Sequence, residues 1–113
     1  MHNTEEGVQR KILDPEEIQN LLDARNFKAI RQSFKDFEVA DIAAALDELD
    51  VDYSIALFRL VPRKRRVQLF AHLELERQKD LVEELPDVIV SSILNDMDPD
   101  DRTRLLEDLQ QET

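Results

Sequence analysis

A twelve-residue repeat runs through almost all of this 113-residue chain and constrains its fold more than any other feature. Seven and eight residues after most repeat starts comes an apolar pair, for example Leu57-Phe58 and Leu69-Phe70. A helix-starting or helix-breaking residue stands at each repeat start, namely Asp14, Asn26, Glu38, Asp50, Pro62, Glu74, Pro86 and Asp98. Such a repeat predicts a stack of short helices, each burying its apolar stripe against its neighbours. Stacks of this kind typically serve binding or regulation through a surface.

The repeat starts set the expected helix ends. Asp14-Pro15 opens a helix because an aspartate accepts from unpaired N–H groups and proline presets φ. The residue before each later proline is driven out of the helical region, so helices end there. We expect helices at about 15–24, 26–35, 37–48, 51–60, 63–72, 75–84, 87–96 and 99–110. Residues 1–13 precede the repeat and are predicted to be a flexible lead, and 14–113 to be one all-α domain.

Composition excludes several classes of function. The net charge of −11 disfavours nucleic acid and anionic lipid as partners and favours cations. A chain with one glycine, Gly7, has no glycine-rich phosphate loop, and no serine has the sequence context of a catalytic nucleophile. We therefore expect no enzyme activity. The absence of cysteine fits a cytosolic location, and the sequence lacks an apolar run long enough to insert in a membrane.

Acidic residues gather at the C-terminal end, where residues 96–113 carry seven acids against two arginines. Asp98, Asp100 and Asp101 stand at a helix start, where carboxylates are favourable in any case. They are also the oxygen ligands that Mg²⁺ prefers, and one or two of them with acids from another surface would form a weak site. Capping and metal binding both remain open.

A basic cluster, Arg63-Lys64-Arg65-Arg66, interrupts the acidic chain. It lies at an expected helix start, where cations are unfavourable by a few tenths of a kcal/mol each. One interpretation is a solvated face attracted to the chain's own carboxylates. The other is a docking patch for an acidic partner domain.

Four segments make the chain resemble the cytosolic N-terminal domain of MgtE magnesium transporters. They are VADIAAALDELD, SIALFRLVPRKRRVQLFAHLE, RQKDLVEELP and LNDMDPDDRTRLLEDL, and their order and spacing carry the resemblance over residues 15 to 110. The resemblance implies a right-handed superhelix followed, in the full protein, by CBS modules and a transmembrane pore. The parent protein is then an integral membrane protein, expected to be a homodimer, with this domain on the cytoplasmic face.

In that family, Mg²⁺ bridges acids of this domain to acids of the CBS modules, and the ion-filled form holds the pore closed. The resemblance places a metal-binding acid at Asp100, beside Asp101. Two other family acids correspond to Gln68 and Arg104, which departs from the pattern and implies weaker ion binding there. The sequence thus predicts a Mg²⁺-sensing regulatory domain. A metal-independent interaction module, similar to domains of flagellar motor switch proteins, is the alternative.

Overall fold

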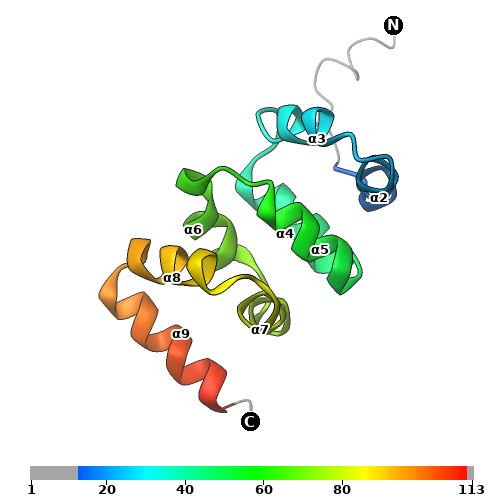
Figure 1. The fold of residues 1–113 in the computed structure, drawn as a ribbon. Coiled ribbons are helices and arrows are strands. Elements are labelled where there is room, and N and C mark those ends of the chain that lie inside the picture. Colours follow the sequence, from blue (N-terminus) through cyan, green and yellow to red (C-terminus); the bar gives the residue numbers. More distant parts are fainter. Residues whose placement is uncertain (1–12, 112–113) are drawn as a thin grey trace, which may run out of the picture.

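The computed structural model describes residues 13–111, and within that range the chain forms eight helices and no strand (Figure 1). The helices are α2 (Pro15–Asp23), α3 (Phe27–Ser33), α4 (Val39–Glu48), α5 (Val51–Arg59), α6 (Arg63–His72), α7 (Leu75–Glu84), α8 (Asp87–Asp96) and α9 (Pro99–Gln111). The predicted all-α fold is confirmed. The predicted flexible lead lies almost wholly outside the described residues.

The repeat starts precede the helices as expected, but they start them in different ways. The carboxylate of Asp14 accepts from the Glu16 N–H at 3.0 Å, and the amide oxygen of Asn26 accepts from the Ala29 N–H at 3.3 Å. Glu38, Asp50 and Glu74 make no such side-chain bond, and each takes an extended backbone before its helix. The repeat starts therefore share a change of backbone direction before the helix, and only some of them also form a side-chain capping hydrogen bond.

The connection between α3 and α4 is longer than expected. Helix α3 stops at Ser33 rather than near residue 35, and α4 begins at Val39 rather than near residue 37. The Ser33 hydroxyl donates to the Ile30 carbonyl at 2.7 Å, and the Asp36 N–H donates to the Ser33 carbonyl at 3.0 Å. These bonds close a tight turn and leave the residues up to Glu38 as a connection, because a serine side chain can satisfy backbone groups in place of the helix ladder.

The corner between α2 and α3 turns on a left-handed residue. Arg25 has φ of 60°, and the N–H groups of Arg25 and Asn26 donate back to the carbonyls of Leu22 and Leu21. This pair of bonds is a Schellman motif, in which glycine usually holds the left-handed position. The chain uses arginine there and accepts the steric cost.

The helices pack in two rows. Along one row α4 contacts α6 and α6 contacts α8, and along the other α5 contacts α7 and α7 contacts α9. Helix α2 closes the N-terminal end against α3, α4 and α5, and α9 lies at the opposite end of the stack (Figure 1). From α4 to α7, each helix thus packs on the helix two places along, as a wound stack requires, whereas α3 contacts chiefly α2. The right hand of the winding stays a prediction.

The apolar pairs form the core. Leu57 and Phe58 are fully buried, and the Phe58 and Phe70 rings meet edge to face with centroids 6.4 Å apart. The second member of the pair becomes more exposed toward the C-terminal end, from 0% at Phe58 and 2% at Phe70 to 43% at Leu106. The core is therefore most completely buried in the middle of the stack.

Three side chains at one repeat position tie the stack together at its corners. Tyr53, Arg65 and Arg77 are the third residues of α5, α6 and α7, and each lies twelve residues after the last. The Tyr53 hydroxyl donates to Asp23 at the end of α2 at 2.7 Å, and this bond raises the pKa of Tyr53. We call the bonds made from this repeat position the corner contacts.

The two arginines of this set act on backbone carbonyls. The Arg65 guanidinium donates to the carbonyls of Phe34 and Phe37, at 3.0 Å for Phe37. The Arg77 guanidinium donates to the Leu49 carbonyl at 2.6 Å and to the Asp47 carbonyl at 3.4 Å. Phe37 and Leu49 are themselves twelve residues apart, so the repeat governs both ends of these bonds.

Candidate functional site

The predicted metal-binding residues lie together at the corner between α8 and α9. Asp98 precedes α9, and Asp100 and Asp101 are in its first turn. All three side chains are exposed. We call this group, Asp98, Asp100 and Asp101, the acidic edge. Its carboxylates lie near the positive end of the α9 dipole, where negatively charged side chains stabilise a helix.

The acidic edge has ligand chemistry suited to Mg²⁺ but is not a closed site. Mg²⁺ takes carboxylate oxygens and usually keeps several waters, so exposed carboxylates on one surface fit part of its coordination shell. Among residues 13–111, however, no group of three or more histidine, aspartate or glutamate side chains is arranged to hold a metal ion. The remaining ligands would have to come from water or from another molecule.

The four residues of the basic cluster differ in their exposure and in their hydrogen-bond partners. The Arg63 guanidinium forms a two-pronged pair with Asp96 at the end of α8, with N–O distances of 3.2 and 3.3 Å. The bond to Asp96 raises the pKa of Arg63. Lys64 is exposed beside it. Arg63 and Lys64 line an open, shallow hollow with Pro62 and Asp96.

Arg65 and Arg66 have structural contacts that the sequence interpretation did not predict. Arg65 makes a corner contact, and Arg66 donates from Nε to the Val61 carbonyl at 3.0 Å. Both side chains are only partly exposed. Arg63 and Lys64 are the members of the cluster whose side chains are exposed, and Arg63 is already paired with Asp96.

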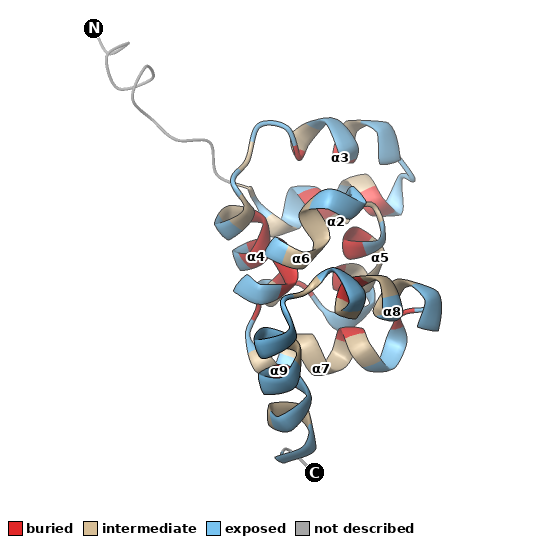
Figure 2. Ribbon diagram, turned by 90° about the vertical axis from the view of Figure 1, so that its left-hand side faces the viewer, coloured by how far each residue is buried: buried red, intermediate tan, exposed pale blue. Residues whose placement is uncertain are grey.

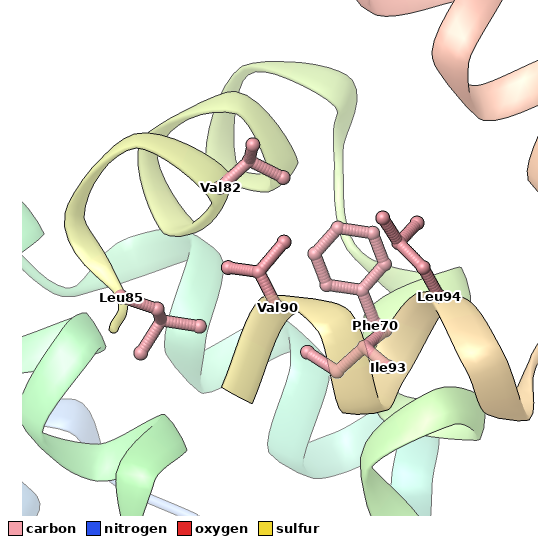
Figure 3. Close-up of a pocket in the computed structure, with 6 residues that line it drawn as sticks. All are labelled: Phe70, Val82, Leu85, Val90, Ile93 and Leu94. Atoms are coloured by element: carbon pink, nitrogen blue, oxygen red, sulfur yellow. The ribbon is translucent and has the colours of Figure 1, made fainter. Parts of the chain in front are cut away.

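An apolar pocket between α6, α7 and α8 offers no chemistry for catalysis. Figure 3 shows its side chains converging from the three helices. The lining residues are Phe70, Val82, Leu85, Val90, Ile93 and Leu94. A pocket without a polar group lacks the convergent donors and acceptors that orient a ligand. We interpret it as loose packing between successive repeats.

His72 lies exposed at the end of α6. Its Nδ1 is 2.9 Å from the carbonyl oxygen of Gln68, one turn earlier in the same helix. The other histidine, His2, lies outside the described residues. Among those residues, no helix is long and apolar enough to serve as a membrane span.

Comparison with protein families gives one match. The family model of the MgtE intracellular N domain matches residues 37–113, which is more than half of the chain. The chain belongs to the MgtE intracellular N domain family. No curated protein matches it. Membership indicates a cytosolic domain of a magnesium transporter.

The matched range of the MgtE N domain covers α4 to α9, including the acidic edge and the basic cluster. Helices α2 and α3 lie before it, although they share the twelve-residue repeat. Gln68 and Arg104, where the resemblance expected acids, are both exposed. Neither adds a carboxylate to the surface.

The MgtE N domain also contains polar contacts between distant residues that the sequence interpretation did not predict. Asp47 accepts from the Glu74 N–H at 3.4 Å, so a residue of α4 caps the start of α7. Asp96 pairs with Arg63 across 33 positions. The twelve-residue spacing of Arg65 and Arg77 is a sequence signal that the two residues share one structural role. No local sequence pattern indicates that Arg63 pairs with Asp96.

Proposed function

We propose that this domain senses cytosolic Mg²⁺ for its parent transporter by ion-dependent docking of its acidic edge onto CBS modules. Family membership is the observation that carries the proposal. The exposure of Asp98, Asp100 and Asp101 supports it, because open carboxylates can share an ion with a second surface. Docking in the presence of Mg²⁺ would favour the closed pore, and loss of the ion would favour opening.

The electrostatics suit an ion-dependent contact. A chain with a net charge of −11 is repelled by another acidic surface, and a divalent ion between the two would reverse that repulsion. An ion that binds only the docked state stabilises it by mass action, by about 2.7 kcal/mol when its concentration is a hundred times its dissociation constant. The domain would supply carboxylates held by the α8–α9 corner and needs no catalytic group.

The test measures association of the domain with the CBS modules of its parent transporter, by calorimetry, in millimolar Mg²⁺ and in chelator. We expect association in Mg²⁺ and at least tenfold weaker association in chelator, which corresponds to about 1.4 kcal/mol. Replacing Asp100 and Asp101 by asparagine should remove most of this difference. The matched control is Glu107→Gln, which removes an exposed charge from the same helix away from the corner.

Equal association in Mg²⁺ and in chelator would contradict the proposal and favour a metal-independent interaction module. The contribution of the basic cluster is separable by the variant Lys64→Glu. Lys64 is exposed, so its reversal should weaken docking without a loss of helical signal. Reversing Arg65 or Arg66 is a poorer test, because both donate to backbone carbonyls.

A further inference from the structure

The corner contacts stop before the last two helices. The third residue of α8 is Ile89 and the third residue of α9 is Asp101, each in register with Arg77. An isoleucine has no polar group, and an ionised carboxylate accepts hydrogen bonds but donates none. Neither can make the bond to corner carbonyls that Arg65 and Arg77 make.

The last two helices are nevertheless joined to one another. Arg102 of α9 donates from Nη1 to the Leu94 carbonyl of α8 at 3.4 Å. This bond repeats, 24 residues later, the bond from Gln78 of α7 to the Phe70 carbonyl of α6. We call α8 and α9, linked by this bond, the C-terminal hairpin; each also packs on a helix of the preceding stack, α8 on α6 and α9 on α7.

Burial is lower in this hairpin than in the middle of the stack. The buried residue of α8 is Ile93 and that of α9 is Leu105, among the residues that the structure describes. Helix α7 also buries one residue, Leu81, whereas α4 buries Ile42, Ala43, Ala45 and Leu46. Figure 2 shows the contrast between the largely exposed α9 and the buried face of α4. Elements with few buried apolar contacts open at lower free energy than the rest of a protein.

A polar contact bridges the hairpin and the helices before it. The Arg63 guanidinium at the start of α6 holds Asp96 at the end of α8 through two N–O contacts. The Arg63 side chain is 67% exposed and that of Asp96 is 35% exposed. Exposed ion pairs of this kind contribute little, so this bond can break without a large loss of stability.

We propose that α8 and α9 open as one unit from a body formed by α2 to α7, with the Arg63–Asp96 pair as the latch between them. The body is held by the corner contacts of Tyr53, Arg65 and Arg77 and remains folded when the hairpin opens. Since the hairpin carries the acidic edge, its opening would move those carboxylates relative to the body. This motion is a property of the chain alone and does not depend on metal binding.

Hydrogen exchange of the whole chain, without metal or partner, tests the proposal. Amides of α8 and α9 should exchange at least about tenfold faster than buried amides of α4 to α6, because local units open well below the free energy of global unfolding. Arg63→Ala should speed exchange in α8 and α9 together by up to about fivefold, the range for an exposed ion pair. Exchange in α4 should not change.

Lys64→Ala is the matched control for the latch, because it removes the same charge from the same turn and leaves Asp96 paired. Equal effects of Arg63→Ala and Lys64→Ala would refute the latch. Equal protection in α9 and α4, or a response of α8 without α9, would refute opening as one unit. All of these outcomes are independent of Mg²⁺-dependent docking.

A second pair of variants tests the missing corner contact. Asp101→Arg places a guanidinium at the repeat position of Arg65 and Arg77, whereas Asp100→Arg makes the same charge change one residue away. We expect Asp101→Arg to slow exchange in α9 several-fold more than Asp100→Arg does. Equal exchange in the two variants would show that the missing contact does not set the boundary of the opening unit.

Discussion

At the scale of single residues, several charges stand where local rules disfavour them, and distant partners explain why. Arg63 and Arg65 lie at the positive end of α6, and Asp96 lies at the negative end of α8. Arg63 and Asp96 pair with each other, and Arg65 donates to carbonyls that α3 and its corner leave without partners. A residue that is unfavourable for its own helix is thus used to join helices.

Asp47 gives a pH-dependent prediction at this scale. Burial raises its pKa above the ordinary 3.8, and the hydrogen bond from the Glu74 N–H opposes that shift. A carboxyl whose pKa is raised by folding stabilises the fold when protonated, and that contribution is lost as pH rises through the raised pKa. Asp47→Asn should therefore be more stable than the parent chain at pH 7, with the difference vanishing near pH 3.

Urea unfolding at the two pH values measures this difference. The control is Glu48→Gln, which removes one exposed charge from the same helix end. An Asp47→Asn variant that is less stable than the parent at pH 7 would show that the charged cap on Glu74 outweighs the cost of burial.

At the scale of helices, most of the fold could be predicted because each twelve-residue unit repeats the same pattern of a helix-starting residue followed by an apolar pair. The residues at the repeat starts predicted seven helix starts within about one residue, all except that of α4, and the apolar pairs identified the core. What could not be predicted was the length of the connection before Val39, since it depends on how Ser33 bonds its own helix. The corner contacts were also missed, because their partners lie 28 to 31 residues away in sequence.

The corner contacts give the prediction for this scale. Arg77 is 12% exposed and donates to two corner carbonyls and to Asp80. Arg77→Met should cost about 2–3 kcal/mol, because charged hydrogen bonds are lost and buried acceptors are left unpaired. Arg63→Met, at an exposed ion pair, should cost less than about 1 kcal/mol. Urea unfolding of both variants gives the comparison, and equal costs would remove the special role of the corner.

At the scale of the whole molecule, the excess of negative charge opposes compaction. The acidic edge was predictable as a group because its three residues are close in sequence. Whether that group is complete was not predictable, because a closed metal site depends on side chains from other helices or other molecules. The structure shows exposed carboxylates without a closed site among residues 13–111.

Salt should therefore stabilise the domain. Raising NaCl above physiological strength screens the repulsion between carboxylates and should add about 1 kcal/mol, or about 4–8 °C in Tm for a domain of this size. MgCl₂ at matched ionic strength is the comparison. A further rise with MgCl₂ would indicate ions bound to the isolated domain, whereas a fall of Tm with NaCl would contradict the prediction.

The corner contacts also bear on how quickly the chain reaches its native state. Each joins segments about 30 residues apart, as does the Arg63–Asp96 pair. Such contacts are not local, so the loop entropy lost in closing them makes them form after the helices and the turns between neighbouring helices. Nucleation near α4 to α6, followed by outward growth, would make the helices at the two ends of the stack the last to form.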